Sequence, residues 1–264
     1  MENIKQLRER TGAGIVDCKK ALEEAGGDLD QAVEILRKKG IAKAYKRTEN
    51  EATEGVIKVE VNEKGDTGYI LEINSETDFV AKNDNFQKFA SDVMELIKQN
   101  EPGSKEELEA MNLEKGTVRE ELDNLSGVIG EKLQINRFEV LKGATVAAYS
   151  HMGGRIGVLV SLNKEGEQEL TTDVAMQVAA TNPKYLNPDQ VPAEEVEKEK
   201  EVYRQELKEQ GKPEEIIEKI IEGKINKYYE EVCLIKQEFI KDDKKKVEDI
   251  LGEAQVEKYI RYSL

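Results

Sequence analysis

The hydrophobic positions of residues 1–40 repeat at the spacing of short helices, and glycines separate one helix from the next. The second of three such helices places its apolar residues on one face: Ile15, Cys18, Leu22 and Ala25. A third helix follows Asp28, whose side chain can cap it, and the pattern ends this helix before Gly40. A small three-helix module is therefore predicted, followed by a polar linker over residues 48–53.

From Glu54 onward apolar and polar residues alternate, which is typical of half-buried strands. Residues 56–61 and 69–73 flank a Gly-Asp-Thr-Gly turn, so a β-hairpin is predicted there. A connector over residues 75–83 leads into a helix with an apolar stripe: Phe86, Phe89, Ala90, Val93 and Ile97. A further helix and a strand over residues 136–141 complete this first half.

The same order of elements returns in the second half of the chain. Strands over residues 144–149 and 156–162 flank a glycine-rich turn, and a helix that carries Val174 and Val178 follows. We interpret this repetition as two related halves. The predicted fold class is α+β, with a two-part core of small antiparallel sheets and helices.

A glutamate-rich segment, residues 193–231, interrupts the second half. Its apolar residues fall at helical spacing, and Gln-Gly-Lys-Pro at 210–213 breaks the run, so an antiparallel two-helix arm is predicted. Such an arm is either a solvated structural hairpin or a surface that contacts a partner. After it, strand-like and helical patterns close the core. The expected domains are residues 1–50 for the module and linker, 51–140 and 141–192 for the two core parts, 193–231 for the arm, and 232–264 for the closing part.

Charge narrows the classes of ligand that the chain can bind. It has 40 Lys and Arg against 55 Asp and Glu, a net charge of −15. Such a chain repels phosphate backbones, so nucleic acid is not expected as its ligand. It has no apolar run of about 18 residues to cross a membrane, and no apolar stretch of a secretory signal follows its charged start. Residues 1–50 differ, with 11 basic against 9 acidic residues, a net +2 beside −17 for the remainder.

Few residues in the chain are suited to catalysis. His151 is the single histidine, and Cys18 and Cys233 are the two cysteines. They provide neither a histidine-ligated metal centre nor a disulfide framework, which indicates a reducing, cytoplasmic setting. The glycines of residues 153–157 lack the Lys and hydroxyl of a phosphate-binding loop and are better explained as a hairpin turn. We therefore expect no enzyme, no cofactor and no bound metal.

Four stretches occur together in an order that one protein family shares. They are residues 7–14 with 17–22, residues 77–82 (Thr-Asp-Phe-Val-Ala-Lys), His151 with residues 154–160, and residues 175–183. Together they resemble the motifs of bacterial elongation factor Ts, and the resemblance covers essentially the whole chain, arm included. It implies an amino-terminal module like ubiquitin-associated domains, a two-part α+β core and an antiparallel coiled-coil insertion.

The resemblance also implies a function. Members of this family are guanine nucleotide exchange factors that bind the translation GTPase elongation factor Tu with GDP. They disturb its Mg²⁺ and phosphate site and release GDP so that GTP can bind, which supports translation elongation in the cytoplasm. Exchange makes and breaks no covalent bond, which fits the poor catalytic inventory. A homodimer, or a 2:2 complex with elongation factor Tu, remains open.

The residues at 77–80 are the first candidates for the site. In the family, the residue that matches Phe79 is a wedge pushed between partner helices near the magnesium site, and the one that matches Asp78 helps to perturb the Mg²⁺ surroundings. From the residues alone, Phe79 could instead anchor the core and Asp78 could cap a short helical turn. Thr77 and Val80 complete the motif by shaping the turn.

Further candidates match family positions that meet the partner: Lys5, Arg8, Ile15, Val16 and His151. Ile15 lies on the apolar stripe of its helix, so a core role is its alternative, whereas Val16 lies off the stripe. Arg8 could be merely solvated, as most helix arginines are. His151 stands next to a hairpin turn, where a single histidine is usually incidental.

Two hypotheses from other classes remain. The amino-terminal module alone is compatible with a ubiquitin-like or nascent-chain binding protein, although that leaves residues 77–82 and the core unused. Paired carboxylates in so acidic a chain are compatible with a metal-dependent hydrolase, although chance pairs are expected at this composition.

Overall fold

Three helices form the amino-terminal unit of the computed structural model, which describes residues 2–11, 13–45, 47 and 49–264. Helices α1 (Glu2–Thr11), α2 (Ile15–Glu24) and α3 (Leu29–Tyr45) pack around a small core that includes Leu7, Cys18 and Ala32. Asp28 caps α3 as predicted, because its carboxylate accepts the N–H of Gln31 at 2.9 Å. Gly12 of the first family motif and Thr48 of the predicted linker lie outside the described residues.

Helix α3 does not end before Gly40, as the sequence suggested, but continues to Tyr45. Gly40 lies against Gly127 of helix α7 (Val118–Ile129), and a Cβ atom added at Gly127 would stand 2.3 Å from the Gly40 Cα. The missing side chains therefore let two helix backbones approach each other closely. Gly40 serves helix packing here, and it does not terminate the helix.

The core consists of two small antiparallel sheets, as predicted. The first has the order β1 (Glu54–Val61), β2 (Thr67–Ser75), β3 (Leu133–Lys142), and Val56 pairs with Ile73 across its hairpin. The second has the order β4 (Thr145–His151), β5 (Ile156–Leu162), β8 (Val256–Ser263). Strand β8 was not predicted. Val256, Ile260 and Tyr262 are buried at every second position, but the exposed Lys258 interrupts this alternating pattern.

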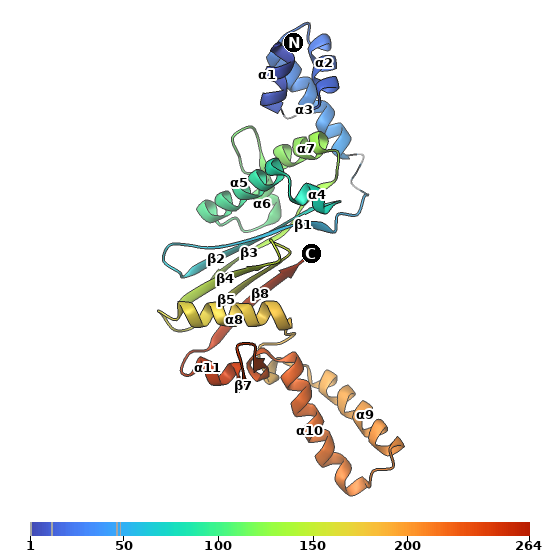
Figure 1. Cartoon of the computed structure of the whole chain (residues 1–264), viewed down its shortest axis with the longest axis vertical. Coiled ribbons are helices and arrows are strands. Elements are labelled where there is room, and N and C mark those ends of the chain that lie inside the picture. Colours follow the sequence, from blue (N-terminus) through green and yellow to red (C-terminus); the bar gives the residue numbers. More distant parts are fainter. Residues whose placement is uncertain (1, 12, 46, 48) are drawn as a thin grey trace.

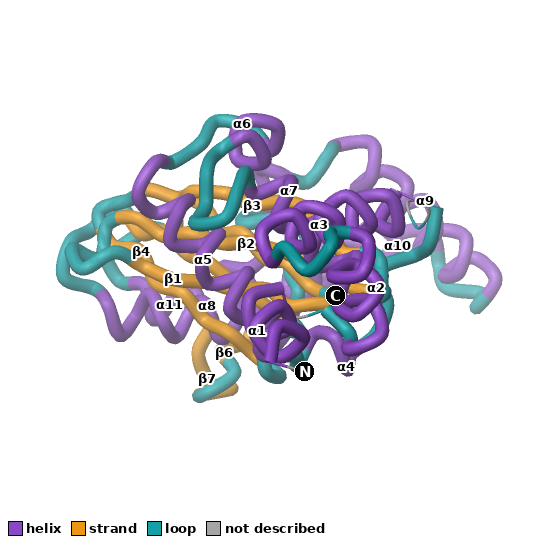
Figure 2. Tube along the Cα trace, turned by 90° about the horizontal axis from the view of Figure 1, so that it is seen from above, coloured by secondary structure: helices purple, strands orange, loops and turns teal. Residues whose placement is uncertain are grey.

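The two sheets pack face to face, with apolar side chains of both between them: Ile57, Ile70, Leu141, Leu159, Ile260 and Tyr262. Figure 1 shows α5 (Asp84–Asn100) and α7 over the outer face of the first sheet and α8 (Gln168–Thr181) over the second. The view in Figure 2 confirms that α5 lies across the strands of the first sheet. The predicted stripe of α5 is buried throughout. The result is an α/β/β/α sandwich.

Short elements complete the two halves. Helix α4 (Asp78–Ala81) precedes α5, and α6 (Lys105–Ala110) lies in the loop before α7. Beyond the arm come the 3₁₀ turn η2 (Leu234–Lys236), the hairpin β6 (Glu238–Phe239) and β7 (Asp242–Lys246), and helix α11 (Val247–Leu251).

The arm consists of α9 (Ala193–Glu209) and α10 (Glu214–Val232), which follow the 3₁₀ turn η1 (Pro188–Gln190). Its helices share a row of buried residues, Leu207, Ile217, Ile221 and Ile225. Ion pairs such as Arg204–Glu218 at 3.0 Å link the helices from outside. In Figure 1 the arm projects from the end of the molecule opposite the three-helix unit. No helix in the described part of the chain is long and apolar enough to cross a membrane.

Candidate functional site

Helix α4 presents Phe79 to solvent. The side chain is 82% exposed, whereas the next residue, Val80, is buried in the core of the first half. The alternative that Phe79 anchors the core is therefore wrong. A helix of a single turn offers one side to the core, and Val80 and the half-buried Ala81 occupy that side.

The sequence did not show which of Thr77 and Asp78 precedes helix α4. Thr77, not Asp78, is the residue that precedes the helix, so the capping hypothesis for Asp78 is wrong. The Asp78 carboxylate instead pairs with Lys82 one turn later, at 2.8 Å. The hydrogen bond from Lys82 lowers the pKa of Asp78, and the positive charge of Arg155 adds to this effect. Asp78 therefore carries a negative charge beside Phe79 at neutral pH.

The turn between β4 and β5 lies at the same end of the sandwich as α4. Its carbonyl at Gly154 accepts the N–H of Ile57 at 2.7 Å, and Arg155 pairs with Glu54 at the start of β1. A Cβ atom at Gly154 would stand 2.9 Å from Val56, so a glycine is needed for this contact. The glycine-rich segment is thus a hairpin turn, as predicted, and it is docked on β1.

His151 is exposed at this turn. Its ring stacks on Tyr149 with centroids 5.9 Å apart, and the Tyr149 hydroxyl lies 3.1 Å from His151 Nδ1. The neighbouring Met152 is 65% exposed in a left-handed backbone conformation, with φ at 53°. Helix α4 and the turn that follows His151 thus lie near each other, because the charge of Arg155 in this turn acts on Asp78.

The other four candidates lie on the three-helix unit, away from α4 (Figure 1). Ile15 and Val16 are 58% and 64% exposed in the first turn of α2, so the core alternative for Ile15 is wrong. Cys18 is the first residue of that helix to be covered. Lys5 and Arg8 are exposed on α1, and Lys5 lies 3.9 Å from Glu9. Charge and apolar surface are thus combined on this unit.

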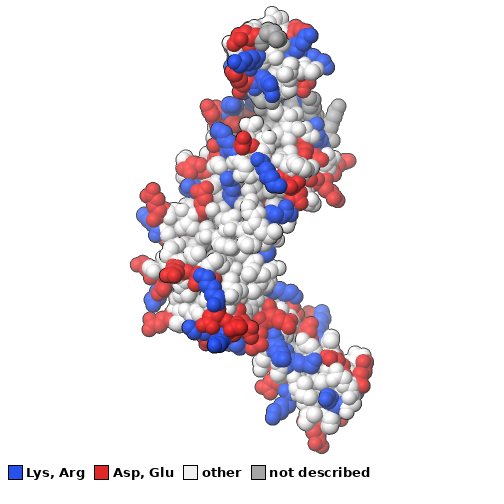
Figure 3. Space-filling view, in the orientation of Figure 1, with Lys and Arg blue, Asp and Glu red and all other residues white. Residues whose placement is uncertain are grey.

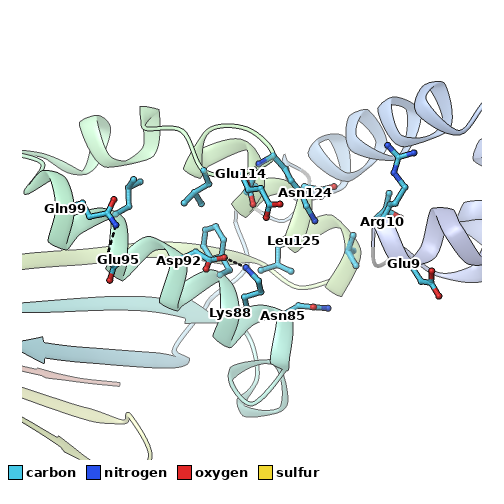
Figure 4. A pocket seen from close by; sticks show the side chains of 17 residues that line it. Glu9, Arg10, Asn85, Lys88, Asp92, Glu95, Gln99, Glu114, Asn124 and Leu125 are labelled. Carbon is cyan, nitrogen blue, oxygen red and sulfur yellow. Dashed lines mark hydrogen bonds and ion pairs between the residues drawn. The ribbon is translucent and has the colours of Figure 1, made fainter.

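A hollow of about 470 Å³ lies between α1, α5 and α7. Figure 4 shows that its walls are mostly charged and amide side chains, among which Lys88 pairs with Asp92 at 2.6 Å. Within the described ranges no three or more His, Cys, Asp and Glu side chains are grouped to hold a metal ion. The hydrolase hypothesis therefore finds no metal site in this part of the chain.

A comparison with protein families decides the assignment. The profile of the family described as Elongation factor TS matches residues 76–264. The chain belongs to the elongation factor Ts family. This membership places it in protein biosynthesis, at translation elongation. The match begins at Glu76, so it includes α4, the His151 turn and the arm, and the hypothesis of a binding module confined to the three helices does not account for it.

The sequence of this elongation factor Ts family member did not predict a role for two residues at the site, Glu76 and Glu131. Glu131 holds Thr77 through both carboxylate oxygens, and Glu76 holds the backbone of Lys132. The pairs lie more than 50 positions apart along the chain, so neither spacing nor periodicity could associate them. The one local signal is that Glu131 directly follows Gly130, the left-handed residue that ends α7.

Proposed function

We propose that the chain is a guanine nucleotide exchange factor that binds elongation factor Tu with GDP, disturbs its Mg²⁺ and phosphate site, and releases GDP so that GTP can bind. Family membership supports the partner, and the exposure of Phe79 carries the proposal. Scattered exposed apolar residues are common on proteins. Phe79, however, is flanked by the anchored Thr77 and the buried Val80, so it is held outward in a fixed place.

The physical basis is differential binding. GTPases hold GDP partly through Mg²⁺, which demands near-ideal octahedral coordination, so small displacements of the ligating loops weaken it. A factor that binds better when those loops are displaced lowers the affinity for GDP, and GDP lowers the affinity for the factor equally. A hundredfold loosening requires about 2.7 kcal/mol, which a few side chains can supply.

Each site residue has a role in this proposal. Phe79 enters between partner helices near the magnesium site, and the ionised Asp78 places a negative charge beside it. Thr77 and Val80 hold the turn. No acid or base catalyst is required, because no covalent bond changes.

The three-helix unit provides a second contact in this proposal. Ile15 and Val16 of α2 offer apolar surface and Lys5 and Arg8 of α1 offer positive charge, in a unit that the proposal takes to be like ubiquitin-associated domains. His151 and its turn add a third contact beside α4. Figure 3 shows charged side chains over the unit and the arm but a largely uncharged middle on this face. Because interface centres are depleted in charge, this middle is compatible with partner contact.

In this proposal, the chain divides into five parts: residues 1–50, 51–140, 141–192, 193–231 and 232–264. The arm acts as an antiparallel coiled coil in association, either with the partner or between two copies in a homodimer or 2:2 complex. The place of action is the cytoplasm, where translation occurs.

The test is release of fluorescent GDP from purified elongation factor Tu, measured over a range of concentrations of this protein. Wild type should accelerate release, and Phe79→Ala should slow the saturated rate by at least about tenfold. Ile240→Ala is the matched control, because Ile240 is an apolar residue 47% exposed between β6 and β7, outside the proposed contacts, and should leave the saturated rate unchanged. No acceleration by the wild-type protein would disprove the proposal.

A further inference from the structure

Two glutamates tie the segment that carries Phe79 to the end of α7. The Thr77 N–H donates to Glu131 Oε2 at 3.0 Å, and the Thr77 hydroxyl donates to Glu131 Oε1 at 2.7 Å. In the opposite direction, the Lys132 N–H donates to Glu76 Oε1 at 2.5 Å. The two dipeptides Glu76-Thr77 and Glu131-Lys132 are thus joined reciprocally. In each, the glutamate carboxylate accepts the backbone N–H of the second residue of the other.

We infer that Glu131 is a positioning residue for nucleotide exchange. Its carboxylate fixes the start of α4 and with it the direction in which Phe79 points. This inference rests on the exchange function proposed above and extends it to a residue that acts through Thr77.

Helix α4 needs support from outside because it is too short to support itself. A single helical turn is unfavourable in water, since nucleation fixes several residues for one hydrogen bond. Two of the backbone hydrogen bonds of this turn are long, 3.4 Å from the Ala81 N–H to the Thr77 carbonyl and 3.3 Å from the Lys82 N–H to the Phe79 carbonyl, and the third, from Asn83 to Val80, is 2.9 Å. The Thr77 side chain accepts no capping hydrogen bond from the helix, and its hydroxyl donates to Glu131. The support therefore comes from Glu131 at the start of α4, from burial of Val80, and from the side chains of Ser75 and Gln87, which donate to the Thr77 and Ala81 carbonyls.

The two bonds to Thr77 constrain it more than one bond could. One oxygen of Glu131 holds the backbone amide and the other holds the side chain, so both the peptide plane and the χ1 angle of Thr77 are fixed. Hydrogen bonds to an ionised carboxylate are about twice as strong as neutral ones. Two residues further on, a rotation of this peptide plane would swing Phe79 away from its present direction.

Glu131 is itself held in place by the end of α7. The Ser126 hydroxyl, which is buried, donates to the Glu131 carbonyl at 2.6 Å. Gly130 ends the helix in the left-handed region, with φ at 91°, and its N–H returns to the Ser126 carbonyl. On the other side, the Glu76 carboxylate holds the amide of Lys132 and also accepts from Asn50 at 2.9 Å. A carboxylate on so constrained a backbone can determine the position of Thr77, and not only follow it.

The experiment measures GDP release from elongation factor Tu with full-length Glu131→Ala and Glu131→Gln. Glu131→Ala should lower the saturated rate about tenfold, because a charge-assisted bond to each group of Thr77 is lost. The half-saturating concentration should change less than about twofold, since the other contacts remain. Glu131→Gln keeps one acceptor oxygen and should fall between wild type and Glu131→Ala.

Glu121→Ala is the matched control. Glu121 also lies on α7 and accepts a backbone amide, that of Lys115, at 2.7 Å, but it does not touch α4. Its loss should leave the saturated rate within about twofold of wild type.

The double variant Glu131→Ala/Phe79→Ala separates positioning from general stabilisation. If Glu131 acts through Phe79, its removal should slow exchange no further once Phe79 is absent. A merely structural role would reduce the rate by the same factor in both backgrounds, and that outcome would overturn the inference. If Glu131→Ala does not fold, Glu131→Gln and Thr77→Val repeat the comparison with smaller changes.

A second measurement keeps this inference distinct from the proposed function. Hydrogen exchange of the Thr77 amide, in the free protein, should accelerate at least about tenfold in Glu131→Ala and stay unchanged in Glu121→Ala. If wild type does not accelerate GDP release, the proposed function fails, whereas the hydrogen exchange of Thr77 still shows whether Glu131 orders the start of α4. A faster Thr77 amide in a folded Glu131→Ala variant that exchanges nucleotide normally would reject the positioning role.

Discussion

Phenylalanines that lie close together in this chain meet very different surroundings. Phe86 and Phe89 lie on the buried face of α5, whereas Phe79 projects from α4 with most of its side chain exposed. The difference depends on helix length, because α5 is long enough to turn one face fully toward the sheet and α4 is not. An apolar side chain on a single helical turn can therefore remain exposed and be available for contact with a partner.

We expect this difference to appear in stability. Phe79→Ala should lower the free energy of unfolding by less than about 1 kcal/mol, as surface changes do. Phe86→Ala should lower it by roughly 3–5 kcal/mol, through lost burial and a cavity. Urea unfolding of both variants measures the two values. Equal losses would mean that Phe79 packs against the core after all.

At the scale of elements, the periodic segments were predictable and the exceptions have identifiable causes. The stripe of α5, the first hairpin and the two arm helices follow from apolar spacing, because each is long and one-sided. The extension of α3 past Gly40 did not follow, since its reason is a contact with a helix about ninety positions away. The motif at residues 77–80 could be found from sequence because it is contiguous. Its attachment to Glu131 could not, because that residue lies 54 positions from Thr77.

The glycine contact between α3 and α7 leads to a prediction for partner binding. Gly127→Ala should displace α3, because the new Cβ would stand 2.3 Å from the Gly40 Cα. If the three-helix unit docks on the partner, the half-saturating concentration for GDP release should rise while the saturated rate is kept.

Gly223→Ala is the control for this prediction. Gly223 lies inside α10 with no atom within 4 Å of an added Cβ, so alanine there should stabilise the protein by about 0.5–1 kcal/mol. An unchanged half-saturating concentration in a folded Gly127→Ala variant would argue against docking by the three-helix unit.

At the scale of the whole molecule, the two sheets share a polar contact as well as an apolar core. Glu72 of β2 is only 3% exposed and accepts from Arg137 Nε of β3 at 2.7 Å. The Arg137 guanidinium lies over the ring of Tyr262 on β8, 3.9 Å from its centroid. Burial, with the charge of Glu139, raises the pKa of Tyr262, so its hydroxyl stays neutral between the two sheets. The contact of Glu72, Arg137 and Tyr262, called the seam below, thus links the two halves.

Arg137→Ala should destabilise the protein by about 2 kcal/mol, because Glu72 would remain buried without its cationic partner. Arg10→Ala should cost less than about 1 kcal/mol, since its partner Asp30, at 2.9 Å, is exposed. Urea unfolding followed by circular dichroism compares them. Similar losses in both variants would show that the seam adds nothing beyond an ordinary surface pair.

Acid should weaken the attachment of α4 in a defined direction. The Lys132 amide, and then Asn50, lower the pKa of Glu76 from its usual 4.5. A carboxylate with a depressed pKa stabilises the fold fully above about pH 4.5, and this contribution is lost as the pH falls through the folded-state value. Stability of wild type should therefore drop below pH 4.5 more steeply than that of Glu76→Gln. Parallel pH curves for the two proteins would contradict this.

The order of strands has a consequence for synthesis of the chain. Every strand of the first sheet comes from one continuous stretch, residues 54–142, so this sheet can form on the ribosome as soon as that stretch emerges. The second sheet must wait for β8, which residues 163–255 separate from β5. At about 5–20 residues added per second, β4 and β5 stay without their third strand for roughly 5–20 s. During this interval the apolar face around Ile57 and Ile70 lacks Ile260 and Tyr262 of β8, and we expect chaperones to bind the nascent chain at that stage.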